Sequence, residues 1–584
     1  MKSYQNRWDG TYVLLSLFSI LLISFITYKE ALTYYFTARD TFPLIWAGQI
    51  RSYSDIFRIF STPLGGDLTF WGMYRPISQL SYGIDYLMWG YNPSGYHLTD
   101  LLLHSLNSLL VFWLAVTLFK DSRKKLLCGW FSAVLFSINP ININLVPTIA
   151  RRHDMIATFF LILCLLAASK TIVGDAHKRL WYILSLSLGT LCIFSKESAY
   201  VLPFILGCYC FIFSSQTDCI ERLKLAIKYV TPLFVVVFFN IILHLHIIGR
   251  LRSLPERLST HIKTGAIFLF HLIDPIGLLK VDDYTKTLIF ILLSFSFAIF
   301  LLLVLIKNRK QGWIAIFLSD SYKCHSFLFV YMAIFGIFYA FVAKVIGRWY
   351  VYMPNVAFAL FITRTAFHPS KSRLTASITR GLSITIMVYI VTFSPLFTEY
   401  TAWHKSSEIT RRTFNEIKKA VTTRLVGKRR PTIYQVNLPT WLVHKSYLTT
   451  EESSIFANYS MVAWAKMSES DDFPYVEFIS LSYTVMFDSS DTKPRLDYFL
   501  NGNSIYVQSK NVEIIPAFNS GAKGEEPLIF RFNNKEGEIT FERNLEENEL
   551  LLLYDGGNIE IIDRDWLARH LNHIPTKGES NQAT

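Results

Sequence analysis

The feature that most constrains the fold is a series of long apolar segments between residues 11 and 397, separated by short charged loops. A helix of about 20 apolar residues is long enough to cross the hydrocarbon core of a bilayer. The whole chain is 52% hydrophobic and 17% charged, whereas charged residues make up about 25% of an ordinary globular protein. The sequence therefore predicts a mainly α, polytopic transmembrane helix bundle.

Hydropathy and helix-ending signals divide this region into predicted membrane spans, and we expect roughly 11 to 13 of them. The clearest are residues 11–28, 96–119, 127–138, 154–172, 180–194, 198–214, 229–248, 287–306, 325–345, 349–363 and 381–397. The first has no small-residue cleavage site, so it is predicted to be retained. In the long loop 29–95, the stretches 41–60 and 76–90 have the periodicity of helices at a membrane interface. We predict one more interfacial helix within residues 249–283.

Basic residues concentrate in alternate loops, and this asymmetry predicts the orientation. The basic loops are residues 120–125, 177–179, 222–228, 307–310 and 364–380. Loops rich in Lys and Arg face the cytoplasm, so the first loop and the 139–154 corner are predicted on the outer face. Five charged residues then share that face, which predicts a single site: Asp40, Arg75, Asp154, Lys196 and Arg348.

The chain changes character after residue 400. Residues 402–424 have the pattern of an amphipathic helix, and short β-type runs separated by turn signals follow. These runs are Thr432–Val436, Tyr475–Tyr483, Ser504–Val507, Leu528–Phe532 and Leu550–Tyr554. The sequence predicts a transmembrane domain over residues 1–400 and a small, soluble β-rich C-terminal domain over 401–584, in an extracytoplasmic position.

The net charge of +13 does not indicate nucleic-acid binding. Residues 400–584 contain 21 basic and 25 acidic residues, so the positive excess lies in the membrane region and follows the orientation rule. No basic cluster on a soluble face is evident. The seven cysteines all precede residue 330, so the tail is not a disulfide scaffold.

Asp40 is the candidate catalytic acid. It lies in the outer loop between the first span and a predicted interfacial helix, where a carboxylate can act as general base on an acceptor hydroxyl. The alternative from position alone is a solvated loop acid or a helix N-cap.

Five basic residues at the same face suit a phosphate group, because Arg donates two parallel hydrogen bonds to phosphate. They are Arg75, Arg151, Arg152, Lys196 and Arg348. For any one of them, the alternative is a side chain that reaches the lipid headgroups, and Lys196 with Glu197 can form a local ion pair.

His97 and His104 are seven residues apart and would share one helix face, with Asp100 between them. This spacing is weak evidence for a metal site because no HExxH pattern is present, and packing or hydrogen bonding is the favoured role. Neither a Gly-rich phosphate loop nor a GxSxG pattern occurs. We therefore expect no metal, no cofactor and no nucleotide, and an energy-rich donor would arrive on a lipid.

These motifs, taken in order, resemble the GT-C superfamily of integral-membrane glycosyltransferases, and most closely its protein O-mannosyltransferase and TMTC-like group with bacterial relatives. The resemblance covers about residues 10–400. It rests on Tyr74-Arg75-Pro76, Tyr96-His97-Leu98, Leu103-His104, Ala133-Val134-Leu135-Phe136, Asn139-Pro140, Arg152, Asp154, Ser195-Lys196-Glu197-Ser198 with Pro203, and Arg348-Trp349-Tyr350-Val351-Tyr352-Met353-Pro354.

The resemblance implies an inverting transfer from a polyprenyl-phosphate-linked sugar to a glycan, lipid or protein acceptor at the non-cytoplasmic face. Asp40 would be the base, and the donor phosphate would be held by Arg75, Arg152, Lys196 and Arg348. The residues that would organise the site are His97, His104, Asp154, Glu197 and Tyr350.

The chain departs from the group's pattern in several places. Asp40 follows Arg39 where the group usually has two acids, so which of the two it replaces is open. Asn139 stands for a His, Arg151 for a Gly, Asp100 for an Asn and Gly347 for a Glu. The sequence contains no tetratricopeptide repeats, so the β-rich tail becomes a candidate for acceptor recognition.

Two other classes of function stay open. A transporter or flippase for a lipid-linked glycan would use the same basic residues, but it should show charges at mid-membrane depth and repeated halves. A non-catalytic relative would bind the lipid as an assembly factor. The expected location is a bacterial inner membrane, with the endoplasmic reticulum as the alternative.

Overall fold

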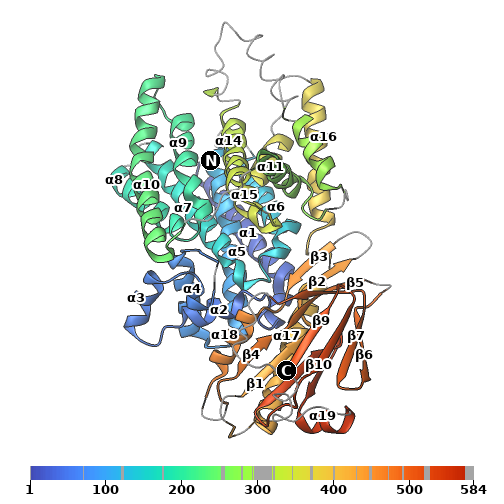
Figure 1. The fold of residues 1–584 in the computed structure, drawn as a ribbon. Coiled ribbons are helices and arrows are strands. Elements are labelled where there is room, and N and C mark those ends of the chain that lie inside the picture. Colours follow the sequence, from blue (N-terminus) through green and yellow to red (C-terminus); the bar gives the residue numbers. More distant parts are fainter. Residues whose placement is uncertain are drawn as a thin grey trace.

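The computed structural model describes most of the chain. The described residues are 2–69, 71–119, 124–173, 177–216, 218–250, 257–277, 281–292, 294, 318–319, 322–344, 346–367, 373–398, 401–425, 427–428, 431–445, 450–470, 473–489, 492–517 and 527–571. A bundle of helices is formed by residues before 400, and a β-rich region lies against one end of it (Figure 1). The predicted fold class, mainly α with a β-rich C-terminal region, is confirmed.

Six helices in the described part are long and apolar enough to cross a membrane. The longer helices are α1 (Lys2–Tyr28), α5 (Pro93–Leu118), α6 (Lys125–Ser137), α7 (Arg152–Val173), α10 (Cys219–Ile248) and α14 (Lys323–Val342). The apolar segments of α6 and α7 continue through the 3-10 turns η3 (Pro140–Asn144) and η4 (Ile149–Arg151). The chain is therefore an integral membrane protein.

The remaining predicted spans correspond to shorter helices. These are α8 (Lys178–Ile193), η5 (Glu197–Val201) with α9 (Leu202–Phe213), η6 (Arg348–Val351) with α15 (Tyr352–Phe367), and α16 (Arg373–Thr392). A helix was predicted within 249–283, and α11 (Leu258–Ile273) lies there; its position at a membrane interface stays a prediction. Most of the predicted span 287–306 lies outside the described residues, so the total number of spans stays a prediction.

The first loop is folded into short helices, as the periodicity predicted. They are η1 (Lys29–Thr33), α2 (Thr41–Gly48), α3 (Tyr53–Ser61), η2 (Gly66–Leu68) and α4 (Pro76–Trp89). They lie at the end of the bundle that faces the β-rich region (Figure 1). Whether α3 and α4 lie at a membrane interface stays a prediction.

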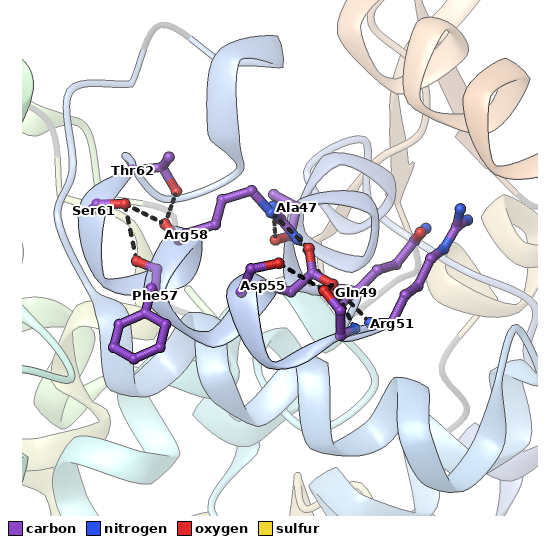
Figure 2. Close-up of polar contacts among 10 residues, drawn as sticks. Ala47, Gln49, Arg51, Asp55, Phe57, Arg58, Ser61 and Thr62 are labelled. Atoms are coloured by element: carbon purple, nitrogen blue, oxygen red, sulfur yellow. Dashed lines mark hydrogen bonds and ion pairs between the residues drawn. The ribbon is translucent and has the colours of Figure 1, made fainter.

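Helix α3 is fixed to the turn before it by charged side chains (Figure 2). The amides of Arg51 and Ser52 donate to Asp55 Oδ2 at 2.9 and 2.8 Å, which caps the helix start. Arg58 Nη1 and Nη2 donate to the carbonyls of Ala47 and Gln49, each at 2.8 Å. These contacts hold one face of α3 against the loop and leave its apolar face exposed.

Among the described residues, the β-rich region contains three four-stranded sheets with the orders β12-β11-β1-β4, β6-β7-β10-β9 and β3-β2-β5-β8. The strands are β1 (Thr432–Val436), β2 (Leu438–Lys445), β3 (Thr450–Ser454), β4 (Glu477–Ser480), β5 (Ser482–Ser489), β6 (Arg495–Asn501), β7 (Ser504–Lys510), β8 (Val512–Pro516), β9 (Leu528–Phe532), β10 (Glu536–Phe541), β11 (Glu549–Tyr554) and β12 (Ile559–Ile562). Strand β1 runs parallel to both β11 and β4. Helices α17 (Thr401–Arg424), α18 (Asn458–Ser468) and α19 (Arg564–His570) accompany them.

Aromatic packing joins the β-rich region to the first loop. The ring of Phe414 on α17 stacks on Trp464 of α18, with centroids 4.3 Å apart, and meets Phe42 of α2 at 5.1 Å. The amide of Tyr35 donates to Ser407 Oγ at 2.7 Å. These buried aromatic contacts join residues on both sides of the predicted domain boundary at residue 400. The two predicted domains therefore pack together in one core. Their independence as domains stays a prediction.

Candidate functional site

Asp40 lies at the junction between the first loop and the β-rich region. It occupies the N-cap position of α2, but its carboxylate makes no capping hydrogen bond. Instead, Tyr459 of α18 donates its hydroxyl to Asp40 Oδ1 at 2.7 Å. Arg151 Nη2 lies 3.7 Å from Asp40 Oδ2, and the side chain stays 21% exposed. The carboxylate is therefore oriented by other groups while one part of it reaches the surface.

The backbone just before Asp40 is unusual. Ala38 has a φ of +65°, in the left-handed region that residues with a Cβ rarely adopt. Arg39 then lies over the ring of Trp441, 5.0 Å from its centroid, and donates from Nη1 to Thr440 Oγ1 at 3.1 Å. Contacts with strand β2 hold this turn and thereby fix the direction of the Asp40 side chain.

Two aromatic rings connect Asp40 to a buried lysine. The guanidinium of Arg151 lies 4.1 Å from the ring centroid of Trp349, and the Trp349 ring stacks on Tyr350. The amine of Lys196 lies 5.1 Å from the Tyr350 ring. The residues from the predicted site motifs around positions 40, 151, 196 and 349–350 are therefore brought together.

Lys196 forms an ion pair with Asp154 Oδ1, and Asp154 Oδ2 lies 3.3 Å from His153 Nε2. Both partners of the Lys196–Asp154 pair are buried. Burial lowers the pKa of the Lys196 amine to about 8, although the negative charge of Asp154 acts in the opposite direction. The centre of the site therefore holds a buried ion pair between the Lys196 amine and the Asp154 carboxylate.

Arg75 and Glu197 form the neighbouring pair, from the start of α4 and from η5. The distances from Arg75 Nε and Nη2 to Glu197 Oε2 are 2.8 and 2.6 Å. Arg75 is 6% exposed. Glu197 Oε1 is buried and accepts no hydrogen bond within the described part of the chain. Lys196 and Glu197, adjacent in sequence, thus bind different partners rather than each other.

The charge of Arg152 is fully enclosed by other parts of the protein. Its side chain is 0% exposed and lies between Asp85 and Asp100, with Nη1 2.6 Å from Asp85 Oδ2 and Nε paired with Asp100 Oδ1. Nη2 donates to the carbonyl of Tyr96 at 3.0 Å, and Tyr82 lies beneath the guanidinium. This arrangement favours a structural role for Arg152 over contact with a phosphate.

Arg348 lies at the edge of the group. Its Nη2 donates to the carbonyl of Ile276 at 3.2 Å. It lines a small cavity of about 20 Å³ together with Pro140 and Glu451, the latter on strand β3. Arg348 and a residue of the β-rich region therefore line the same cavity.

The two histidines on α5 have separate surroundings. His97 Nε2 lies 3.2 Å from the carbonyl oxygen of Tyr35. His104 bonds through Nδ1 to the hydroxyl of Tyr352 at 2.8 Å and through Nε2 to the carbonyl of Ser137 at 3.1 Å. The Asp100 between them pairs with Arg152. No group of three or more His, Cys, Asp or Glu side chains suited to a metal ion was found among the described residues.

Sequence reasoning missed two residues that shape the site. Asp85 pairs with Arg152. The only signal in the sequence was that Asp85 lies in an amphipathic stretch that was predicted to be helical. Tyr459 contacts Asp40 from 419 residues away, and no local pattern connects a tyrosine in the tail with the first loop.

Comparison with curated proteins finds O-mannosyltransferases. The chain is 30% identical over 164 residues to human protein O-mannosyl-transferase TMTC4 and 27% identical over 190 residues to Drosophila melanogaster protein O-mannosyl-transferase Tmtc1. The matches cover 23% and 32% of this chain. They cover only 22% and 21% of the relatives' own lengths. The resemblance to the TMTC-like group is thus confirmed in sequence, over part of each protein.

Comparison with solved structures finds several neighbours, including these two. One is ArnT from Cupriavidus metallidurans, with a TM-score of 0.37 and 10% identity, covering 74% of this chain and 83% of ArnT. The other is the Archaeoglobus fulgidus oligosaccharyltransferase, with a TM-score of 0.37 and 10% identity, covering 72% and 60%. No family model matches the chain.

Proposed function

We propose that this protein is a membrane glycosyltransferase that moves a sugar from a polyprenyl-phosphate-linked donor to a hydroxyl acceptor on the non-cytoplasmic face. The observation that carries the proposal is the position of Asp40, partly exposed beside Arg151 and connected through Trp349 and Tyr350 to the buried cation of Lys196. An anionic base next to a cationic group suits a reaction that removes a proton and releases a phosphate. The similarity to O-mannosyltransferases supports this reaction class.

In the proposed reaction, Asp40 accepts the proton of the acceptor hydroxyl as the hydroxyl oxygen attacks the anomeric carbon of the sugar. The bond between this carbon and the phosphate oxygen breaks, and its electron pair leaves with the polyprenyl phosphate. Attack from the face opposite to the leaving group inverts the anomeric configuration. Tyr459 and Arg151 position the Asp40 carboxylate before the acceptor binds.

The leaving phosphate needs positive charge around it. Lys196 and Arg75 are the proposed contacts, and Asp154 and Glu197 hold them in place. Arg348 is a third contact at the edge of the site. Arg152 belongs to the proposal as the residue that organises α4, α5 and α7 through Asp85 and Asp100. His97, His104 and Tyr350 support the walls of the site.

The acceptor in the proposed reaction is the molecule whose hydroxyl attacks the sugar. A glycan, a lipid or a protein hydroxyl fits the same chemistry, and the contacts of Asp40 with α18 and of Arg39 with β2 bring the β-rich region to the reacting group. The proposal therefore gives this region a part in acceptor binding. It also includes a bacterial inner membrane as the location, with the endoplasmic reticulum as the alternative.

The decisive experiment compares Asp40→Asn with the wild type and with Asp67→Asn, a control acid in the same loop. Membranes with matched expression receive a panel of radiolabelled polyprenyl-phosphate sugars, and transfer to cell-envelope acceptors is measured. Loss of a general base lowers the rate by about 10²- to 10⁴-fold. We expect this loss for Asp40→Asn, with binding of polyprenyl phosphate retained, and none for Asp67→Asn.

Two outcomes would decide against the proposal. Equal transfer by the wild type and Asp40→Asn would show that Asp40 is not the base. If none of the donors is transferred while polyprenyl phosphate still binds, a flippase or a non-catalytic assembly factor becomes the better explanation. Lys196→Met completes the set, because it should weaken the binding of polyprenyl phosphate without creating an alternative base.

A further inference from the structure

A second hollow lies in the membrane region, away from Asp40. It has a volume of about 840 Å³ and is lined by residues of α1, α6, α15 and α16. Its walls are mainly apolar, with Trp130 and Val134 on α6 and Met387 and Val391 on α16. We call this hollow the α6–α16 groove. Helix α16 stands at the side of the bundle (Figure 1) and packs mainly along α15, so the groove opens to the surroundings of the bundle.

Two basic residues lie in this apolar lining. Lys124 directly precedes α6, and Arg380 lies in the first half of α16. Phe131 and Phe367 contact each other beside this end, with ring centroids 5.1 Å apart. Both cations are exposed. An apolar channel with positive charge at one end is complementary to an amphiphile with a negatively charged head.

The dimensions favour a lipid of one leaflet. From Arg380 to Thr392, α16 rises about 18 Å, and the 13 residues of α6 rise about 20 Å. Half of the hydrocarbon core of a bilayer is about 15 Å thick. An acyl chain that starts at the two cations would therefore follow the groove through its own leaflet and end near the level of Val391.

The direction of the helices separates this groove from the proposed donor site. Helix α6 starts beside Lys124 and ends at Ser137, after which η3 and η4 lead to Arg151. Helix α15 likewise runs from Tyr352, which contacts His104, to Phe367 in the groove. The cations of the groove and the cation of Lys196 therefore lie at opposite ends of these helices. By the orientation rule, the predicted basic loops 120–125 and 364–380 face the cytoplasm, which places Lys124 and Arg380 toward the cytoplasmic side.

We propose that the α6–α16 groove binds an anionic phospholipid of the cytoplasmic leaflet, with its phosphate at Lys124 and Arg380 and an acyl chain between α6 and α16. The lipid fills the apolar space between the two helices and thereby supports the position of α16. This site is separate from catalysis, so its test does not require that any sugar is transferred.

The test uses full-length protein purified in a neutral detergent. Native mass spectrometry measures the binding of phosphatidylglycerol, phosphatidylcholine and polyprenyl phosphate to the wild type and to a Lys124→Gln/Arg380→Gln variant. A single surface cation contributes about fivefold to the binding of an anionic lipid, so loss of both predicts a decrease of about 30-fold for phosphatidylglycerol. Binding of phosphatidylcholine should be weaker and should not change.

The matched control is Lys178→Gln/Arg179→Gln, which removes two exposed cations at the start of α8, outside the groove. Val388→Trp tests the apolar part independently, since Val388 lines the groove and is 58% exposed, and the larger ring should displace the chain. Equal binding of phosphatidylglycerol and phosphatidylcholine by the wild type would overturn the proposal. So would equal losses in the two double variants, or displacement of phosphatidylglycerol by polyprenyl phosphate.

Discussion

At the scale of single residues, Arg152 shows the clearest difference between the role suggested by its sequence motif and the role indicated by its contacts in the structure. The motif suggested that this side chain holds a phosphate. In the structure it is fully buried between Asp85 and Asp100, and Thr99 donates a further hydrogen bond to Asp85 Oδ1 at 2.8 Å. A charge with no exposure and two acidic partners stabilises the packing of helices, because separating it from either acid would leave a buried charge unpaired.

We predict that Arg152→Met destabilises the protein by about 3–5 kcal/mol, the usual cost of removing one partner from a buried ion pair. The physical reason is that Asp85 and Asp100 would be left without their shared cation. Thermal unfolding of the purified protein in detergent measures the effect. Arg179→Met, at an exposed position on α8, serves as the control and should change little.

Replacing the two acidic partners by neutral residues should partly rescue the stability of Arg152→Met. Adding Asp85→Asn and Asp100→Asn to Arg152→Met removes the unpaired negative charges and should restore part of the lost stability. If Arg152→Met instead unfolds like the wild type but no longer binds polyprenyl phosphate, the phosphate-binding role predicted from the sequence is correct and the structural role is wrong.

At the scale of elements, the helices were largely predictable and the sheets were not. Long apolar runs and their polar ends located α1, α5 and α7, because hydropathy over 20 residues is a strong local signal. The runs Thr432–Val436 and Leu528–Phe532 were predicted with the bounds that β1 and β9 have. The pairing of β1 with β11, over 100 residues away, carries no local signal. Helix α18 was missed because its apolar residues lack a clear helical period.

Helix α3 was predicted from the sequence, and its position at the bilayer interface stays a prediction. Its exposed face presents large apolar side chains: Tyr53 is 89% exposed, Phe57 76% and Phe60 37%. The other face is anchored by Arg58 and Asp55 (Figure 2). Such a face, next to the membrane helices, is typical of a helix that lies in the bilayer interface.

We predict that the side chain at position 57 enters the lipid interface. A spin label at Phe57→Cys, in a background with the exposed Cys219 replaced by serine, should be reached by oxygen more readily than by a water-soluble nickel complex. A label at Glu536→Cys on β10 is the aqueous control, because this residue is exposed on the β-rich region. Equal accessibility to nickel at both positions would show that α3 lies in water.

At the scale of the whole molecule, the candidate site depends on both regions of the chain. Arg75, Asp154, Lys196 and Arg348 were predicted to share one face from the charges of the loops alone, and the structure brings Lys196 and Asp154 into contact. The sequence could not show that Tyr459 completes the surroundings of Asp40, since this contact depends on how α18 packs on α2. The motifs thus named residues that the structure brings into contact, whereas the contact between Tyr459 and Asp40 depends on tertiary packing.

The same packing makes the orientation of the protein testable with two positions. Since α18 contacts the first loop, the β-rich region and Asp40 must lie on one side of the membrane, and the basic loops predict that this is the outer side.

Cys219 is exposed at the start of α10, beside the predicted cytoplasmic loop 222–228. A Glu536→Cys variant adds a thiol on β10. In spheroplasts, a membrane-impermeant maleimide should label Glu536→Cys directly and Cys219 only after permeabilisation. Labelling of Cys219 in intact spheroplasts, with position 536 protected, would reverse the orientation. Asp40 and the proposed transfer would then lie on the cytoplasmic face. The α6–α16 groove would then lie in the outer leaflet instead of the cytoplasmic one.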